Sequence, residues 1–291
     1  QTGDYAENLQ ATPIVVDGVL YLISARARVF AIDGATGKEL WNYRYPEPSR
    51  DTPGFVGNRG LAVSAGKVVF GTKDNYMVAL DQKSGRLVWK TNLDDAKQCG
   101  CNITAAPLVA KDKVIVGGSG GDGAHRGYIT ALDINSGRLA WRWYVIPGPG
   151  EKGHETWKGD SWRFGGGAPW LTGSFDPALN TVYWGTGNAG PDWDGDARLG
   201  DNLYSSSVIA LDVDTGKLKW HYQFSPHNEF DWDATQIPVL ADIQFKGRQR
   251  KAMLWANRNG MFYVLDRTSG DRKSTRLNSS HTDISRMPSS A

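Results

Sequence analysis

The chain has 291 residues and a net charge of +2, from 33 Lys and Arg against 31 Asp and Glu. The basic residues are scattered, so the charge indicates neither a nucleic-acid-binding nor a membrane-surface protein. No apolar run is long enough to span a bilayer, and the first residues lack the charged and apolar regions of a signal peptide. We expect them to be a mature N-terminus or a break in a longer chain. The 35 Gly, 12 Trp and 11 Tyr are typical of an all-β protein with short strands.

An internal repeat runs along the chain. The segments "AIDGATGKELW", "ALDQKSGRLVW", "ALDINSGRLAW" and "ALDVDTGKLKW", which begin at Ala31, Ala79, Ala131 and Ala210, share the pattern A-[IL]-D-x-x-[ST]-G-[KR]-x-x-W. Each follows an alternating apolar segment, namely "GVLYLIS", "KVVFGT", "KVIVGG" or "TVYWGTG". The pattern predicts strand, strand, turn and a strand with Trp, a β-meander of about 40 to 50 residues, which is the period of propeller blades. The sequence therefore predicts a β-propeller with about four to five blades.

The fixed positions of the repeat have structural explanations. We expect the aspartates to accept hydrogen bonds from their own turns, and the tryptophans to pack between adjacent blades. The aspartates are Asp33, Asp81, Asp133 and Asp212, and the tryptophans are Trp41, Trp89, Trp141 and Trp220.

Cys99 and Cys101 are the only cysteines and form a Cys-Gly-Cys segment. Two cysteines alone do not make a four-ligand zinc site. A disulfide across one glycine would be strained, so the sequence leaves two buried thiols and a redox pair as alternatives. Cysteine usage does not settle the compartment either.

The segment "HNEFDWDATQ", His227 to Gln236, places Asp231 and Asp233 on either side of one tryptophan. If the segment is extended, both carboxylates point to one side and Trp232 points to the other. Two such charges repel each other unless a cation or a proton lies between them. The alternative is a solvated loop with two unrelated acids.

A fifth copy of the repeat begins at "YVLDRTSG", Tyr263 to Gly270, but Ser274 stands where Trp is due. From Asp271 to Ala291 the sequence has no aromatic residue and no apolar periodicity, and we expect no strand there. Its first residues, "DRKSTRLNSSH", can be back-translated to a common sequencing-library adapter. We therefore expect residues 1–270 to be part of a propeller and residues 271–291 to be a non-native tail. Finding this coding sequence intact in an independently cloned gene would contradict that expectation.

Six segments between the repeats carry a family resemblance: "GNRGLAV", "SGGDGAHRGYITALD", "GGGAPWLTGSFDPALNTVYWGTGN", "GDNLYSSSVIALD", "HNEFDWDATQ" and "ANRNGMFYVLDRTSG". In this order they resemble the quinoprotein alcohol and methanol dehydrogenases, which are eight-bladed propellers that bind pyrroloquinoline quinone (PQQ) and one metal ion on the central axis. The resemblance covers Gln1 to Gly270, roughly the first half of such an enzyme. It implies that blades are missing from this chain.

The resemblance also implies a metal site. The family's ligand positions correspond to Asp122, Asn188 and Asp231, with Asp122 in place of the usual Glu. Oxygen ligands without Cys or His suit a hard cation, either calcium or a lanthanide. Asp233 occupies the position that marks the lanthanide-using branch, and a trivalent ion relieves the repulsion of one more carboxylate.

The quinone-binding positions of the family correspond to residues spread over the whole chain. Trp170 matches the tryptophan that stacks on the cofactor, and Arg258 matches the basic residue beside the reacting carbon. The remaining positions are Gln10, Arg59, Thr104, Ser119, Gly120 and Gly121. In two places the chain departs from the family. Pro53 and Gly54 stand where adjacent cysteines are frequent, and Gln10 stands where Glu is common.

The implied reaction is the oxidation of a primary or secondary alcohol to an aldehyde or ketone. Asp231 is expected to be the general base, with the metal as Lewis acid and Arg258 stabilising the developing oxyanion. Cytochrome c is the expected electron acceptor, and the bacterial periplasm the expected location. "GGGAPW" differs from the "GGGTNW" of methanol enzymes and favours ethanol or larger alcohols. The alternative is a non-catalytic propeller that acts as an interaction scaffold, which has no need of Asp122, Asn188, Asp231 and Arg258 together.

Overall fold

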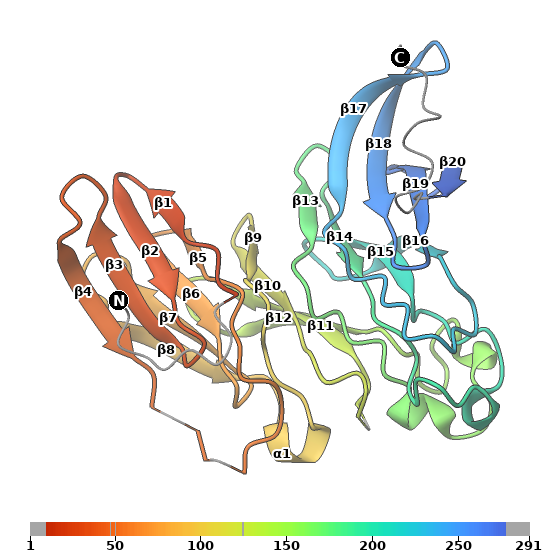
Figure 1. Cartoon of the computed structure of the whole chain (residues 1–291), viewed down its shortest axis with the longest axis horizontal. Coiled ribbons are helices and arrows are strands. Elements are labelled where there is room, and N and C mark those ends of the chain that lie inside the picture. Colours follow the sequence, from red (N-terminus) through yellow and green to blue (C-terminus); the bar gives the residue numbers. More distant parts are fainter. Residues whose placement is uncertain (1–9, 47, 50, 124, 278–291) are drawn as a thin grey trace.

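The computed structural model describes residues 10–46, 48–49, 51–123 and 125–277. These residues form five four-stranded antiparallel sheets, which follow one another in chain order along an arc (Figure 1). Each sheet is a meander, because its strands pair in the order in which they occur in the chain. The prediction of an all-β propeller fold is confirmed. Within the described residues, no helix has the length and apolar character needed to cross a membrane.

The strands have the following bounds. The first sheet contains β1 (Ile14–Val16), β2 (Val19–Ile23), β3 (Arg28–Asp33) and β4 (Glu39–Arg44). The second contains β5 (Ala62–Ser64), β6 (Lys67–Gly71), β7 (Tyr76–Asp81) and β8 (Leu87–Asn92). The third contains β9 (Leu108–Ala110), β10 (Lys113–Gly117), β11 (Tyr128–Asp133) and β12 (Leu139–Tyr144). The fourth contains β13 (Ser174–Asp176), β14 (Thr181–Gly185), β15 (Ser207–Asp212) and β16 (Leu218–Gln223). The fifth contains β17 (Val239–Phe245), β18 (Arg248–Ala256), β19 (Met261–Asp266) and β20 (Arg272–Leu277).

The helical elements of the described chain are short; three of them lie in connections between sheets, and one, η3, lies between β14 and β15 of the fourth sheet. Helix α1 (Ala96–Cys99) begins after Asp95, whose side chain accepts hydrogen bonds from Lys97 N and Gln98 N. The 3₁₀ turns are η1 (His154–Thr156), η2 (Ser161–Phe164) and η3 (Asp196–Arg198).

The hydrophobic core is divided into four layers, one between each pair of consecutive sheets. In β6, Val68 and Phe70 pack toward the first sheet, while Val69 packs toward the third. This follows from the two-residue period of a strand, which sends successive side chains to opposite faces. A blade with neighbours on both sides therefore has apolar residues on both faces, and "KVVFG" meets that requirement.

The aspartates of the repeat have the predicted role. In each copy, one carboxylate oxygen accepts from the backbone N–H two residues later, at distances from 3.0 to 3.2 Å. The residues are Asp33, Asp81, Asp133 and Asp212, together with Asp266 of the fifth copy. These bonds shape the turn between the third and fourth strands of each sheet.

The tryptophans of the repeat join each sheet to the next one, as predicted. Each indole N–H donates to the carbonyl that follows the turn aspartate of the next sheet. The pairs are Trp41 to Gln82, Trp89 to Ile134, Trp141 to Val213 and Trp220 to Arg267, at 3.1, 2.9, 2.9 and 3.2 Å. The indole faces lie on the turn glycines of that next sheet, which are Gly85, Gly137, Gly216 and Gly270. A Cβ added to any of these glycines would lie 2.6 Å from the ring.

We expect Trp141→Ala to lower the free energy of unfolding by about 3–5 kcal/mol, the usual cost of truncating a buried tryptophan. Trp141 is 7% exposed and packs in the core between the third and fourth sheets. Its loss leaves a cavity and removes the hydrogen bond to Val213 O. Urea unfolding monitored by far-ultraviolet circular dichroism measures the change.

Trp193→Ala is the matched control, because Trp193 is 70% exposed. We expect this variant to unfold within about 0.5 kcal/mol of the parent chain, as is usual for surface substitutions. An equal loss of unfolding free energy in the two variants would show that the Trp141 contact between the sheets contributes no more to stability than a surface residue.

The fifth sheet corrects one expectation. Strand β20 covers Arg272–Leu277 and pairs with β19, so the expectation of no strand after Asp271 is wrong for these residues. The backbone groups along the edge of β19 can pair with any extended segment, whatever its side chains. Ser274 pairs with Val264, in the register where the other sheets have Trp opposite Ala. A boundary at residue 270 and a non-native tail remain predictions, and residues 278–291 lie outside the described residues.

Candidate functional site

The predicted site residues meet in one cavity of about 440 Å³. They come from two kinds of connection: those between consecutive sheets and those between the second and third strands of a sheet. Meanders packed side by side bring these connections to one end of the fold. The lining includes Arg59, Thr104, Ser119, Gly120, Gly121, Asp122, Trp170, Asn188, Asp231, Asp233 and Arg258. Of the predicted set, only Gln10 is missing from this wall.

Asp231 and Asp233 meet at one guanidinium. Arg258 Nη2 lies 3.1 Å from Asp231 Oδ2, and Arg258 Nη1 lies 3.5 Å from Asp233 Oδ2. The condition of an extended segment is not met at Asp231, where φ is +50°. This left-handed residue turns the chain, and both carboxylates still reach the same cation. Trp232 stacks on Phe230, with ring centroids 4.6 Å apart.

Asp233 is held more firmly than Asp231. It is 7% exposed, and it accepts hydrogen bonds from Trp170 Nε1 at 2.8 Å and Asn188 N at 3.0 Å. Burial raises the pKa of Asp233 to about 6, although these two donors act in the opposite direction. A buried carboxylate with this pKa favours a bound cation or proton, because either one removes the cost of the isolated charge.

Two further acids add negative charge around these carboxylates. Partial desolvation and the charge of Asp231 raise the pKa of Asp122, which stands at the exposed rim. Burial and the charge of Asp122 raise the pKa of Asp192. The Asn188 side-chain amide donates to Asp192 Oδ1 and, at 3.2 Å, to Ala189 O. Because Nδ2 makes these contacts, Oδ1 is the amide atom left for a group in the pocket.

Sequence reasoning missed Asp192. It lies in "GPDWDGD", whose glycines and acids are typical of a solvated loop. The available signal was its spacing, four residues after Asn188, but spacing in a loop does not determine which side chains meet.

Another part of the pocket lining combines a cation with an aromatic ring. The Arg59 guanidinium carbon lies 4.7 Å from the Trp170 ring centroid, and burial lowers the pKa of Arg59. Arg59 Nη1 and Thr104 Oγ1 are buried and have no hydrogen-bond partner among the described residues. Unpartnered buried polar atoms are costly, so a polar ligand on this wall would compensate for them.

A strip of small residues forms the floor of the pocket. Ser119 pairs with Asn102 in an isolated bridge, and its hydroxyl donates to Asn102 O at 3.1 Å. Gly120 has φ +109°, and a Cβ there would lie 2.6 Å from Gly100 O. Gly120 and Gly121 therefore let backbone form the surface where a flat ligand can approach closely.

Gln10 lies in an adjoining cavity rather than in the pocket. That cavity shares Arg59 and Trp170 with the pocket and is also lined by Ile14 and Ile237. Gln10 is exposed and precedes the first strand. Its contact with a cofactor stays a prediction.

Cys99 and Cys101 are joined by a disulfide. On sequence grounds, a disulfide across one glycine is expected to be strained, which favours two thiols or a redox pair. Gly100 makes the bond possible, because its φ of +64° ends α1 and turns both side chains to one side. Gly100 also lines the pocket, whereas neither cysteine is among the lining residues.

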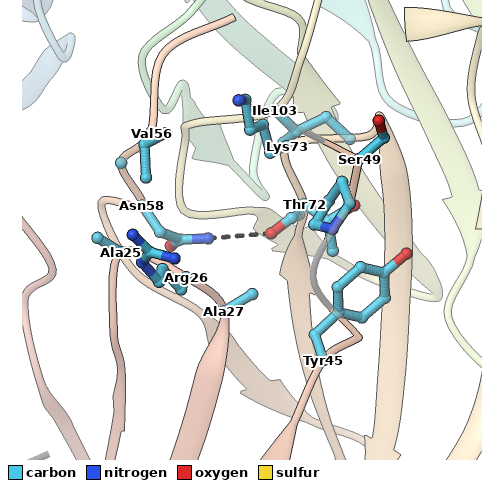
Figure 2. A pocket seen from close by; sticks show the side chains of 13 residues that line it. Ala25, Arg26, Ala27, Tyr45, Ser49, Val56, Asn58, Thr72, Lys73 and Ile103 are labelled. Carbon is cyan, nitrogen blue, oxygen red and sulfur yellow. Dashed lines mark hydrogen bonds between the residues drawn. The ribbon is translucent and has the colours of Figure 1, made fainter. Parts of the chain in front are cut away.

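A second cavity, of about 430 Å³, lies between the loops of the first two sheets (Figure 2). Tyr45, Asn58 and Lys73 are among its lining residues, and Asn58 Nδ2 donates to Gly71 O at 3.0 Å. Its wall holds none of the predicted site residues. The predicted site residues thus line the carboxylate-containing pocket and not this second cavity.

We expect Gly187→Ala to weaken metal binding about 10–100-fold, the range found when groups that orient metal ligands are altered. A Cβ at Gly187 would lie 2.7 Å from Asp233 Oδ1 and 2.9 Å from Ala168 O. The carboxylate must therefore move. Isothermal titration of the chain with lanthanum measures the effect, and the unfolding midpoint shows whether the fold is retained.

Gly118→Ala is the control, because a Cβ there makes only ordinary contacts, at 3.7 Å or more. Equal affinity of the Gly187 variant and the parent would contradict the assignment of Asp233 to the metal.

The fold and the pocket define a class: a β-propeller with a cluster of oxygen ligands at one end of its blades. Comparisons with known proteins agree with this class and refine it. Residues 1–272 match the family model of the PQQ, glucose/ethanol/alcohol dehydrogenase β-propeller domain. The quinohemoprotein alcohol dehydrogenase of Comamonas testosteroni is 44% identical over 282 residues, which is 90% of this chain and 39% of that protein. The quinoprotein alcohol dehydrogenase PedH of Pseudomonas putida is 40% identical, over 92% of this chain and 48% of that protein.

A solved structure agrees with these relatives. A europium-containing methanol dehydrogenase superposes with a TM-score of 0.89 at 36% identity, over 95% of this chain and 52% of that chain. The chain belongs to the PQQ-dependent alcohol dehydrogenase β-propeller family. It spans less than half the length of the two curated relatives, at 39% and 48%.

Proposed function

We propose that this chain carries the quinone- and metal-binding part of an enzyme that oxidises primary or secondary alcohols to aldehydes or ketones. The observation that carries the proposal is the pocket itself. It combines buried donors that have no partner among the described residues with a cluster of carboxylates. A scaffold protein would gain nothing from either feature, because both cost stability in the absence of a ligand.

The residues fit pyrroloquinoline quinone. The quinone is flat and carries three carboxylates, so it needs a slot and several donors. Arg59 Nη1 and Thr104 Oγ1 are buried donors that lack a partner in the described part of the chain. Trp170 offers a ring face at the same wall, and the glycine strip leaves room for a flat ligand. A volume of about 440 Å³ lies within the usual range for small-molecule sites.

The donor set fits a hard cation. Asp122, Asn188, Asp231 and Asp233 offer only oxygen atoms to the pocket, which suits calcium or a lanthanide. We favour the lanthanide, because Asp233 adds a buried carboxylate to the three positions that the family resemblance assigns to the metal. Its raised pKa supports the view that this site needs a strong positive charge.

In the mechanism, Asp231 accepts the proton of the substrate hydroxyl. Arg258 Nη2, 3.1 Å from Asp231 Oδ2, holds this carboxylate at the pocket and stabilises negative charge that develops beside it. Trp170 fixes Asp233 through its indole N–H, so that the second carboxylate keeps its position. Arg59, Thr104 and Trp170 would hold the quinone, which when bound would supply a hydride acceptor, and the clustered carboxylates with Asn188 would hold a metal ion that supplies Lewis acidity.

The test uses the full-length product of the gene that encodes this chain. The protein is freed of metal, supplied with pyrroloquinoline quinone and either lanthanum or calcium, and assayed for ethanol-dependent dye reduction. Activity with lanthanum alone supports the enzyme and the role of Asp233. Activity with calcium alone supports the enzyme and contradicts that role. No activity with either ion, together with no uptake of quinone, overturns the proposal.

Electron transfer and location complete the proposal. Cytochrome c is the proposed electron acceptor of the loaded enzyme, and the bacterial periplasm is its proposed location. The support is indirect, because the relatives are bacterial quinoprotein and quinohemoprotein alcohol dehydrogenases. Reduction of added cytochrome c by the loaded enzyme and alcohol tests the first point.

A further inference from the structure

A second group of metal-ligating atoms lies outside the pocket lining. Cys99 Sγ, Cys101 Sγ and one ring nitrogen of His125 all lie within 4.8 Å of one another. Cys99 ends α1, and His125 lies in the connection between β10 and β11. Cys101 and His125 are 0% and 3% exposed, whereas Cys99 is half-buried. The group is therefore enclosed, with one accessible side at Cys99.

His125 has an unused nitrogen. Its Nε2 atom is buried and has no hydrogen-bond partner among the described residues. Burial, with a smaller effect from Arg142, lowers the pKa of His125 to about 4, so the ring is neutral near pH 7. The ring lies edge-on to Tyr128, with centroids 5.4 Å apart. A neutral imidazole with a free nitrogen is a common metal ligand.

The surroundings favour negatively charged sulfur. Asn75 Nδ2 donates to Cys101 Sγ at 3.2 Å and to Tyr128 OH at 3.0 Å. The Tyr128 hydroxyl lies 3.8 Å from Cys101 Sγ. The Arg142 guanidinium packs over the Tyr128 ring at 4.1 Å and places a positive charge in the neighbourhood. Donors of this kind stabilise and orient thiolate ligands.

We propose that, once the Cys99–Cys101 disulfide is reduced, Cys99 Sγ, Cys101 Sγ and His125 Nε2 bind one thiophilic divalent cation of the Zn²⁺ class. The reductant is a dithiol, which supplies two electrons and two protons to the disulfide and becomes a disulfide itself. Each cysteine then releases its proton to solvent as its sulfur binds the ion. A water molecule on the open side, next to Cys99, provides the fourth ligand that Zn²⁺ requires.

This site differs in chemistry from the pocket. The pocket offers carboxylate and amide oxygens, which select hard cations, whereas this site offers two sulfurs and an imidazole, which select softer ones. The two sites are adjacent in the chain, because Gly100, which lines the pocket, lies between the two cysteines. The proposal does not depend on the alcohol dehydrogenase activity.

The test uses the 291-residue chain. It is reduced anaerobically with a phosphine, saturated with lanthanum to occupy oxygen sites, and titrated with Co²⁺ as a spectroscopic probe for Zn²⁺. We expect a thiolate-to-cobalt charge-transfer band that saturates at one ion per chain and is displaced by Zn²⁺. The unreduced chain should show no band, and Cys99→Ser should weaken it. His125→Gln should lower the Co²⁺ affinity at least about tenfold, whereas His154→Gln, a histidine outside the group, should leave it unchanged.

The proposal is overturned if the reduced chain gives no charge-transfer band, or if His125→Gln binds Co²⁺ as tightly as the parent. If His125→Gln does not fold, X-ray absorption of the Zn²⁺-loaded parent chain decides. Two sulfur neighbours at about 2.3 Å and a nitrogen at about 2.0–2.1 Å support the site. A zinc shell without sulfur, or with sulfur but no nitrogen, overturns it.

Discussion

Replacing Asp231 with asparagine should lower alcohol-dependent dye reduction by the full-length enzyme about 10²–10⁴-fold, the contribution usual for a general base. The amide retains an oxygen that can face a metal ion, but it does not accept a proton from the substrate hydroxyl. The ion pair with Arg258, at 3.1 Å, is lost as well. The rate with saturating ethanol, measured at equal quinone and metal occupancy, isolates this effect from binding.

Glu229→Gln is the matched control for this variant. Glu229 lies two residues before Asp231 in the same loop, its side chain is 45% exposed, and its carboxylate lies 3.8 Å from His227 Nε2. This variant removes one negative charge from the loop at a similar place in the chain. We expect its rate to stay within about threefold of the parent, since surface charges act weakly at a distance in water. Equal losses in the two variants, or an unchanged rate in the Asp231 variant, would remove Asp231 from the mechanism.

Replacing Asp233 with asparagine should reverse the metal preference of the enzyme. We expect lanthanum-supported activity to fall at least about tenfold while calcium-supported activity is kept or gained, because a trivalent ion depends more on carboxylate charge than calcium does. The substituted amide also meets the donors Trp170 Nε1 and Asn188 N, so one of the two hydrogen bonds is lost. Activity titrations with each ion, on metal-free protein loaded with quinone, give the two affinities.

Asp201→Asn serves as the control, because Asp201 is exposed and lies outside the pocket lining. It should leave both metal titrations unchanged. If the Asp233 variant retains its lanthanum affinity, Asp233 has no part in selecting the ion.

The repeat made the fold largely predictable. Its pattern contains the turn aspartate, the glycine and the tryptophan, and these three residues make the contacts within and between sheets. The pattern thus carries information about tertiary structure as well as local structure. Strand β20 shows the limit of such patterns, because a strand can form by pairing with an available edge without any apolar alternation of its own.

The sequence was enough to predict which segments form the site, but not how their side chains are placed relative to one another. The segments that resemble the family lie in equivalent connections, so the fold brings them to one end. Which side chains meet there depends on individual backbone angles and loop paths. The left-handed Asp231, the position of Asp192 beside Asn188 and the displacement of Gln10 into an adjoining cavity are examples. The Cys99–Cys101 bond depends on the turn at Gly100, which a two-cysteine spacing does not specify.

The indole contacts between sheets form a series of interfaces, and each interface links only two neighbouring blades. The inner interfaces, which contain Trp89, Trp141 and Trp220, lie between blades whose connections line the pocket. The interface at Trp41 attaches the first sheet, whose strands contribute no residue to the pocket lining. Weakening the packing at one of the inner interfaces would leave every sheet intact, but it would divide the pocket between two groups of blades that move independently. The cavity would then lose its shape before the sheets lose their hydrogen bonds. Ligand binding in the pocket would therefore weaken under conditions in which the circular dichroism spectrum is still unchanged.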